Sequence, residues 1–419
     1  QEAGGESLTP IATRLSLEDP ATPAEALWTV PFIRITLTQF LLFCGFLMLL
    51  PVVPLYLSRF TSHEGVIGGT VGLFTFSAFL ARIWFGPLVD LTGRRRVLLA
   101  GLLWFAACCA LYAATASVLS VAVVRVLHGL GFAAAMTALG AMAADVIPPV
   151  RRGEGMGFYG SGENVAQAFM PVVGFAIVGL WGFAAVFYLS SLTVVAAWVL
   201  AGFQPETGTP DPSPARQKKV VFGLESQALL PAFLALVISF VSGAVFVLMP
   251  LYAIEYGMTN PGPFYTGFAL SVLLLRAAAG AVADRHGAVP MIAGGLVLQG
   301  FGLAAIGFWP AAFAVFMLPG GIMAGAVLMG LGIGILVPIT HAVAIARSPR
   351  ERWGAAGATY LAGNNLGIGL GAFLLGSLGA VVGLDIMYRW SVLGPLAGLI
   401  YLLYTRDGWY VRKPVIESE

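Results

Sequence analysis

The sequence predicts an all-α membrane protein with twelve transmembrane helices, arranged as two pseudo-symmetric bundles of six. Its composition, its apolar segments and an internal repeat support this fold class. The 419-residue chain is 58% hydrophobic and only 10% charged, and its mean hydropathy is +0.89. Because ordinary soluble domains carry about 25% charged residues, this chain has too little polar surface to cover a water-soluble globule.

Twelve segments are long enough to cross a bilayer, which takes about 20 mostly apolar residues. They are residues 32–57, 66–88, 97–115, 119–144, 157–179, 182–203, 229–253, 264–283, 289–308, 319–345, 355–380 and 385–404. The boundary between the ninth and tenth spans is the least well defined, because the run from Trp309 to Gly321 is apolar but interrupted by prolines and glycines. The 53 glycines are dispersed through the spans, as expected where small residues let helices approach closely.

Four motifs recur in the same order in both halves, at offsets of 194 to 201 residues. The first pair is Pro54-Leu55-Tyr56 and Pro250-Leu251-Tyr252, and the second is the loop motif Arg82, Gly86, Asp90 and Gly93, repeated as Arg276, Gly280, Asp284 and Gly287. The third pair is Gly129-Leu130-Gly131 and Gly330-Leu331-Gly332. The fourth is Tyr159, Gly162 and Asn164, repeated as Tyr360, Gly363 and Asn365. Two similar bundles in one membrane protein place a substrate path at their interface, near the bilayer midplane.

The predicted organisation has five parts, which are a disordered cytoplasmic tail (1–28), a first bundle (29–203), a linker (204–228), a second bundle (229–405) and a cytoplasmic tail (406–419). The first tail is polar and acidic, contains three prolines, and lacks the basic-then-apolar start of a signal peptide. The linker contains four prolines and a basic cluster at residues 216–219, which is typical of a polar connection between domains.

The basic residues predict the orientation, because cytoplasmic loops carry an excess of Lys and Arg. Alternate loops and the C-terminal tail hold fifteen of them on one side, against two on the other. The fifteen are Arg94, Arg95, Arg96, Arg151, Arg152, Arg216, Lys218, Lys219, Arg285, Arg347, Arg350, Arg352, Arg406, Arg412 and Lys413, and the two are Arg59 and Arg389. We therefore expect a multi-pass protein of the plasma (cytoplasmic) membrane with both termini in the cytoplasm.

Several of these motifs resemble signatures of one transporter family. The stretch from Gly86 to Arg96 resembles the loop signature of the major facilitator superfamily, and Arg125 to Gly131 resembles its fourth-span signature. Asp145 to Pro149, followed by Arg151-Arg152-Gly153, resembles a loop of its drug:proton antiporter group. The resemblance implies the major facilitator fold. The segment Met170 to Phe175 keeps only one Pro and one Gly of that group's fifth-span motif, which leaves export and drug specificity open.

The resemblance also implies a conformational latch at the loops. Its residues would be Gly86, Asp90, Gly93, Arg94, Asp145 and Arg82, with Asp284 and Arg276 in the repeat. We expect Asp145 to pair with Arg94, and Asp90 to point toward the start of the eleventh span. A glycine-pinched turn that acts only as a static staple is the alternative.

Glu163 and Arg125 are the candidates for proton coupling. Charges inside a bilayer are costly and mark function, and for Arg125 the resemblance to the fourth-span signature implies a part in proton coupling. Glu163 is the only acidic residue well inside a span, and amides occupy the equivalent positions of the repeat. Burial raises the pKa of a carboxyl group, so a carboxyl here can take up and release protons. Arg125 would tune Glu163 or bind an anionic group. The alternatives are a permanently protonated Glu163 and an Arg125 that only pins helices.

Polar and aromatic residues near the predicted interface are candidates for a substrate cavity, although at helical spacing such residues are often plain packing. The candidates are Tyr56, Asn164, Gln167, Phe240, Phe246, Tyr252, His341, Tyr360, Asn364 and Asn365. His128 and His341 are expected to be packing residues, with a place in the cavity as the alternative for His341. The three cysteines lie in apolar runs, which is typical of buried thiols.

The sequence contains no phosphate-binding Gly-x4-Gly-Lys-Ser/Thr loop and no hydrolase, metal or redox constellation, so we expect no enzyme, cofactor or metal site. The first hypothesis is a proton-coupled exporter of small amphipathic molecules that works by alternating access. The second is an uptake carrier or uniporter for a polar nutrient or metabolite. The third is a non-transporting membrane receptor or scaffold. The expected partners are a small-molecule substrate, protons and membrane lipids, without nucleic acid, and the expected state is a monomer.

Overall fold

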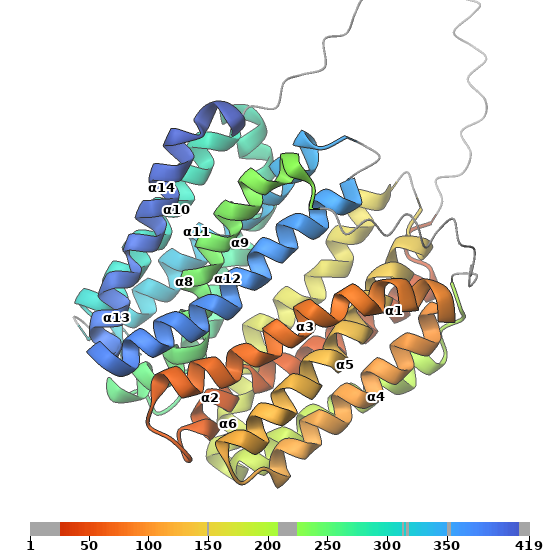
Figure 1. The fold of residues 1–419 in the computed structure, drawn as a ribbon, viewed down its shortest axis with the longest axis horizontal. Coiled ribbons are helices and arrows are strands. Elements are labelled where there is room, and N and C mark those ends of the chain that lie inside the picture. Colours follow the sequence, from red (N-terminus) through yellow and green to blue (C-terminus); the bar gives the residue numbers. More distant parts are fainter. Residues whose placement is uncertain are drawn as a thin grey trace, which may run out of the picture.

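The structure is a computed structural model that describes residues 26–148, 151–207, 224–311, 314–315, 318–349 and 353–409. The first half contains α1 (Val30–Leu49), α2 (Val52–Leu57), α3 (Glu64–Thr92), α4 (Arg94–Leu111), α5 (Val118–Val146) and α6 (Arg152–Gly202). The second half contains α8 (Leu229–Glu255), α9 (Gly262–His286), α10 (Ala288–Phe308), α11 (Gly320–Arg347), α12 (Trp353–Val382), α13 (Leu384–Ser391) and α14 (Leu393–Tyr404). Figure 1 shows these helices as two bundles side by side.

Ten helices of the described residues are long and apolar enough to cross a membrane. One of them, α6, contains Gly182 with φ 79° and ψ 179°, a conformation that breaks the helix into two stretches. In α9 a shorter apolar segment covers Gly262–Leu275. Counting α6 as two spans and α9 as one agrees with the twelve predicted spans. Between α10 and α11, a short antiparallel pair of strands, β1 (Ala314–Val315) and β2 (Leu318–Pro319), occupies the interrupted apolar run.

The internal repeat is visible in equivalent contacts of the two halves. Tyr56 donates a hydrogen bond to the carbonyl oxygen of Thr115, and Tyr252 donates one to that of Ile306. In each half, therefore, the tyrosine that ends the first span ties it to the end of the third. The two halves also use their repeated glycines alike, since Gly129 packs on the backbone of Phe74 and Gly330 on that of Phe268.

The repeated loops are one-residue turns at glycine. Gly93 separates α3 from α4 with φ 96°, and Gly287 separates α9 from α10 with φ 88°. Residues with a Cβ rarely adopt such positive φ values. The predicted tight helix–loop–helix is therefore present in both halves, and the second glycine of the motif makes it.

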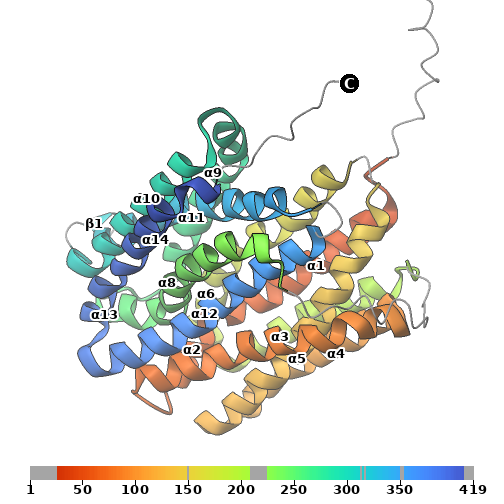
Figure 2. The same cartoon turned by 45° about the horizontal axis from the view of Figure 1, so that its top comes forward.

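We call the end of the molecule that holds these two turns the arginine-rich end, because Arg94, Arg95, Arg96 and Arg347 lie there. The other end, which holds α2 and the turn between α12 and α13, is the opposite end. In Figures 1 and 2, α3 and α12 lie side by side near the opposite end and move apart toward the arginine-rich end.

The two halves pack closely at the opposite end. A Cβ on Gly68 of α3 would lie 2.2 Å from the carbonyl oxygen of Ala372 in α12. On the other side of the interface, Thr266 of α9 donates a hydrogen bond of 2.7 Å to the carbonyl oxygen of Ala168 in α6. Toward the arginine-rich end, by contrast, a Cβ on Gly86, Gly157 or Gly160 would meet no atom within 4 Å. The described conformation is thus closed at the opposite end.

Ordered structure extends into segments that were predicted to be tails or linker. Leu27 is fully buried, and the ring of Trp28 packs on Phe158 with centroids 4.9 Å apart. Trp409 is buried in the second half, on the short helix Arg406–Trp409. Large apolar side chains at residues 27–28 and 409 thus pack on the bundles, and the division of the chain into tails, bundles and linker stays a prediction. Residues 1–25, the basic cluster at 216–219 and residues 410–419 lie outside the described residues.

Candidate transport site

Glu163 lies on α6, eleven residues after the helix begins, and its side chain is exposed. It interacts electrostatically with Arg82 of α3 and with Tyr159, one turn earlier on α6. In this conformation the part of α6 around Gly160 faces open space, and the predicted role of Glu163 in proton coupling stays a prediction.

The direction of Glu163 follows from the faces of α6. Val165 and Phe169 are 41% and 52% exposed and form an apolar stripe suited to lipid. At 100° per residue, Glu163 and Gln167 lie about 160° from that stripe. Gly162 packs on Phe40 of α1, while Ala168 contacts α9. Glu163 and Gln167 therefore point away from the lipid-facing stripe.

Arg125 lies inside the first half and is 1% exposed. Its Nη2 donates a hydrogen bond of 3.0 Å to the carbonyl oxygen of Val71, and its guanidinium lies 4.8 Å from the centre of the Phe74 ring. Its Nε and Nη1 have no hydrogen-bond partner among the described residues. Burial of a charge without full hydrogen bonding is costly, so this arginine lowers the free energy of unfolding of the protein.

A polar cluster lies next to Arg125. His128 is fully buried, its Nδ1 lies 3.2 Å from the hydroxyl of Tyr112, and its Nε2 lies 3.6 Å from the thiol of Cys109. The rings of Phe74 and Phe105 pack on the imidazole. His128 is therefore a packed and hydrogen-bonded residue of the first half.

The residues of the predicted latch are only partly brought together. Arg94 and Asp145 form an ion pair, and Thr207 donates a hydrogen bond of 2.8 Å to the same Asp145 oxygen. The carboxylate of Glu206 accepts from the backbone N–H groups of Arg94 and Arg95 at 3.0 and 3.1 Å. All these residues belong to the first half or to the start of the linker, so this ion pair does not itself join the halves.

The structure does not test the predicted latch role of the remaining residues. Gly86 lies within α3 and Arg82 is half-buried one turn earlier. The side chains of Asp90, Arg276 and Asp284 lie outside the part of the structure that is described. A contact between Asp90 and the eleventh span therefore stays a prediction.

Three cavity candidates of the second half come together between α8, α11 and α12. The hydroxyl of Tyr360 lies 2.8 Å from that of Thr340, and the ring of His341 stacks on Tyr360 with centroids 4.7 Å apart. Ser239 donates a hydrogen bond of 2.6 Å to Asn364. Tyr360 is 2% exposed, so it packs rather than lining open space here.

Comparison with known proteins decides the family. A sequence model described as Major Facilitator Superfamily matches residues 35–281 and 264–415, nearly the whole described chain. This chain belongs to the major facilitator superfamily.

Relatives of full length agree with this assignment. The chain is 22% identical to an uncharacterized MFS-type transporter of Methanocaldococcus jannaschii, over 86% of this chain and 94% of that protein. It is 25% identical to the staphylopine export protein of Staphylococcus aureus, over 85% and 91% of the two chains. A crystal structure of a peptide transporter, POT, superposes with a TM-score of 0.76 at 15% identity, covering 91% and 95% of the chains. The chain is thus a transporter of this superfamily with its fold.

Two cavity candidates of this transporter lie inside their own halves in this structure. Tyr56 and Tyr252 are 6% and 0% exposed, and each is hydrogen-bonded within its own half at the opposite end. Their hydroxyls need partners once they are buried, and the ends of neighbouring spans supply them. They do not line the interface between the halves.

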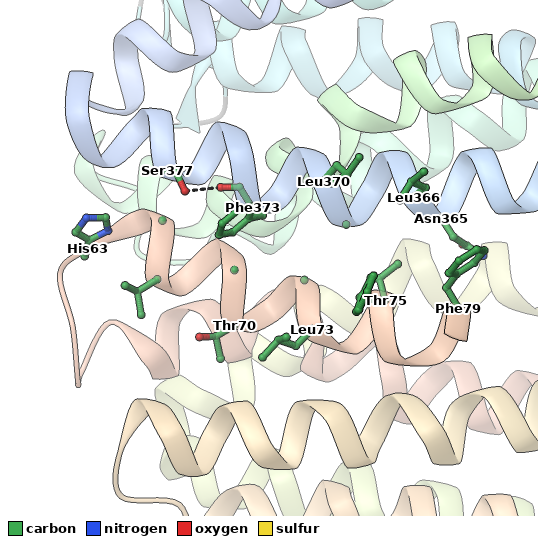
Figure 3. A pocket seen from close by; sticks show the side chains of 16 residues that line it. His63, Thr70, Leu73, Thr75, Phe79, Asn365, Leu366, Leu370, Phe373 and Ser377 are labelled. Atoms are coloured by element: carbon green, nitrogen blue, oxygen red, sulfur yellow. Dashed lines mark hydrogen bonds between the residues drawn. The ribbon is translucent and has the colours of Figure 1, made fainter. Parts of the chain in front are cut away.

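The remaining cavity candidates of the transporter lie in different surroundings. Phe246 packs on Tyr265 and Phe268 within the second half. The backbone of Phe240 lies against Gly371. Asn164 of α6 is 8% exposed and donates a hydrogen bond to the carbonyl oxygen of Gly160. Asn365 lines a groove between α3 and α12, where Figure 3 shows it beside Phe79.

Sequence reasoning missed one acidic centre of the transporter. Asp385, in the first turn of α13, accepts a hydrogen bond from Tyr256 at 2.7 Å. The same carboxylate oxygen lies 2.8 Å from the hydroxyl of Tyr252, whose one hydrogen is shared between Asp385 and the carbonyl oxygen of Ile306. The available signal was a carboxylate two residues after the glycine turn at Gly383. Its role was hidden because both tyrosines come from a helix that lies about 130 residues earlier in the chain.

Proposed function

We propose that this transporter exports small amphipathic molecules in exchange for protons, with Glu163 as the residue that binds and releases the proton. The observation that carries the proposal is the position of Glu163, an acidic side chain inside a membrane span that points away from the lipid-facing stripe of α6. An ionisable residue inside a span is costly and is kept for a function.

The surroundings of Glu163 support a change in its proton affinity during transport. In the described conformation Glu163 is exposed and interacts with Arg82 across the first half. Closure of the arginine-rich end would remove water from the carboxyl group and favour its protonated form. The same residue would then exchange its proton with opposite sides of the membrane in the two conformations.

Export is supported by a relative. The chain aligns over most of its length with a protein named for staphylopine export. If the arginine-rich end is cytoplasmic, as the distribution of basic residues predicts, the described conformation opens to the cytoplasm. An exporter takes up its substrate in that conformation.

The test is a flux assay in proteoliposomes with an imposed pH gradient and a panel of fluorescent amphipathic cations, anions and neutral molecules. We expect wild-type protein to move at least one member of the panel faster with the gradient than without it. Glu163→Gln should keep counterflow of that molecule but lose the acceleration by the gradient, because the amide cannot carry the proton. The matched control is Glu255→Gln, at the exposed end of α8, which should behave as wild type.

Each alternative outcome separates the remaining hypotheses. Counterflow that never responds to the gradient in wild-type protein would favour a uniporter. Accumulation of a polar nutrient in the direction of the proton gradient would favour an uptake carrier. Full gradient dependence in Glu163→Gln would remove this residue from the coupling mechanism, and no flux of any compound would favour a receptor or scaffold.

A further inference from the structure

A groove of about 560 Å³ runs along the surface between α3 and α12. Its two walls come from different halves of the molecule, as Figure 3 shows. Of the residues that line it, only five have polar side chains, which are His63, Thr70, Thr75, Asn365 and Ser377. The groove is therefore an apolar surface that exists only where the two halves meet.

Glycines form the floor of this groove. A Cβ on Gly65 would lie 2.8 Å from the Cα of Ser377, and one on Gly72 would lie 3.3 Å from the carbonyl oxygen of Gly369. The two helices therefore approach at their backbones. The neighbouring side chains of Phe76 and Phe373 are 54% and 49% exposed. Large aromatic side chains therefore form the walls of the groove, and glycine backbone forms its floor.

Four of the five polar residues lie toward the ends of the groove, and Thr70 lies between them. His63 and Ser377 lie at the opposite end of the molecule, and Thr75 and Asn365 lie toward the point where α3 and α12 separate (Figure 3). Between Val66 and Phe79 the groove follows α3 for about 20 Å, at 1.5 Å per residue. One leaflet of a bilayer, half of a hydrocarbon core of about 30 Å, is about 15 Å thick. The groove thus has the length of a single acyl chain, and His63 and Ser377 lie at the end where its head group would be.

We propose that this groove binds one acyl chain of a membrane phospholipid, with the head group beside His63 and Ser377, and that the bound chain favours the conformation closed at the opposite end.

Lipid is the occupant that fits the position of the groove. Both helices cross the membrane, and the exposed Val66 and Phe76 face outward along the groove, so the acyl chains of the bilayer reach it directly. An empty groove would forfeit the dispersion contacts of its walls, and water needs several polar partners, of which the middle of the groove offers only the Thr70 side chain. Lipid tails are as apolar as the protein, so the hydrophobic effect does not favour the groove over the surrounding bilayer. The preference of an acyl chain for the groove would come from the fit of its shape.

The conformational effect follows from the origin of the walls. When the halves move apart at this end, α3 and α12 separate and the groove is lost. A ligand shifts an equilibrium by its differential affinity for the two states. A chain held between Phe76 of one half and Phe373 of the other binds only the closed state.

The binding test uses a photoreactive residue in the full-length protein. Benzoylphenylalanine replaces Phe76 in the groove or, as the control, Phe301 of α10, which is 64% exposed on the lipid-facing surface. Each protein is reconstituted in phosphatidylcholine vesicles doped with an alkyne-tagged phosphatidylcholine, extracted, washed with detergent and then irradiated. We expect the yield of lipid adduct at position 76 to exceed that at 301 by at least about fivefold, equivalent to about 1 kcal/mol.

Variants that fill the groove with a larger side chain should lose lipid binding. Leu370→Trp, and Leu73→Trp from the other wall as a second variant, should reduce the adduct at position 76 to the control level while the protein stays monodisperse. Equal adduct yields at 76 and 301 would overturn the proposal. Displacement of the lipid by a transported compound would also overturn it, because the groove would then belong to the substrate.

The conformational test measures the distance between spin labels on Ser62→Cys and Val381→Cys, at the opposite end of the two halves. The native cysteines are buried. We expect added phosphatidylcholine to shift delipidated protein toward the short distance, and Leu370→Trp to abolish the response to lipid. An unchanged distance distribution on lipid addition in the unfilled protein would contradict the proposal. Neither measurement requires transport, so the result is independent of the proton-coupled export.

Discussion

Arg125 is a buried cation in the first half that the fold does not need for packing. It is 1% exposed and satisfies only part of its hydrogen-bonding capacity among the described residues. The equivalent position of the repeat holds Ala326, which is also fully buried. The same architecture is therefore built with and without the charge, which favours a role in transport.

We predict that Arg125→Met leaves the free energy of unfolding unchanged or raises it by about 1–4 kcal/mol, because an apolar side chain of similar length replaces a partly satisfied buried charge. Proton-driven transport should fall at least about tenfold, which corresponds to about 1.4 kcal/mol. Thermal unfolding in one detergent and proteoliposome flux measure the two quantities. Loss of several degrees in Tm together with transport would instead assign Arg125 a structural role.

The aromatic candidates show the limit of reasoning from single residues. The sequence makes Tyr56 and Tyr252 equivalent, and the structure gives them equivalent hydrogen bonds to the ends of the third and ninth spans. Whether a tyrosine lines a cavity or ties two helices depends on the partner of its hydroxyl. That partner comes from another helix, so the local sequence does not specify it.

The turns between α3 and α4 and between α9 and α10 are the elements that the sequence predicts best. Gly93 and Gly287 leave one residue between two helices, and both adopt a positive φ. A one-residue turn needs this geometry whichever helices it connects, so the motif alone is sufficient to predict it.

We predict that Gly93→Ala and Gly287→Ala each lower the free energy of unfolding by about 1–3 kcal/mol, because a Cβ is strained at these backbone angles. The matched control is Gly294→Ala inside α10, where a Cβ would meet no atom within 4 Å. It should be neutral or stabilise the protein by up to about 1 kcal/mol. Thermal unfolding of the three purified variants tests this, and equal effects at all three glycines would refute the assignment.

The linker is a second element whose role emerges only in three dimensions. Its first residues, Glu206 and Thr207, bind the turn before α4 and Asp145 at the end of α5. Its last residues reach the second half, where the backbone N–H of Glu225 donates to Thr359. The linker is therefore fastened to both halves at its two ends, which composition alone does not indicate.

For the whole molecule, the contacts between halves place the closed interface at the opposite end. Gly68 is central to it, because a Cβ there would collide with the carbonyl oxygen of Ala372. We predict that Gly68→Ala shifts the halves apart at this end and slows transport, since the backbone of α12 cannot yield like a flexible side chain. Gly160→Ala, which points into open space on α6, is the control.

The distance between spin labels on Ser62→Cys and Val381→Cys measures this shift. We expect a longer distance in Gly68→Ala and the wild-type distance in Gly160→Ala. If Gly68→Ala kept the short distance, the glycine contact would not control closure.

The orientation of the molecule is a separate prediction. With both termini in the cytoplasm, a membrane-impermeant maleimide should label Ser62→Cys in intact cells and Arg96→Cys only after permeabilisation. Both side chains are exposed, so access to the reagent depends on the side of the membrane. Labelling of Arg96→Cys in intact cells would reverse the assignment.

The sequence by itself determined the membrane class, the helical bundles, their repetition and the glycine turns, because composition, span length and turn chemistry are local properties of the chain. Only the tertiary structure decided which faces meet. It directed Glu163 away from the apolar stripe of α6, kept the Arg94–Asp145 pair within one half, and formed the groove between α3 and α12. The physical reason is that spans are apolar on both their lipid-facing and their packed sides. Hydrophobic periodicity, which reveals the buried face of a helix in water, therefore says little about which side of a membrane helix contacts its neighbours.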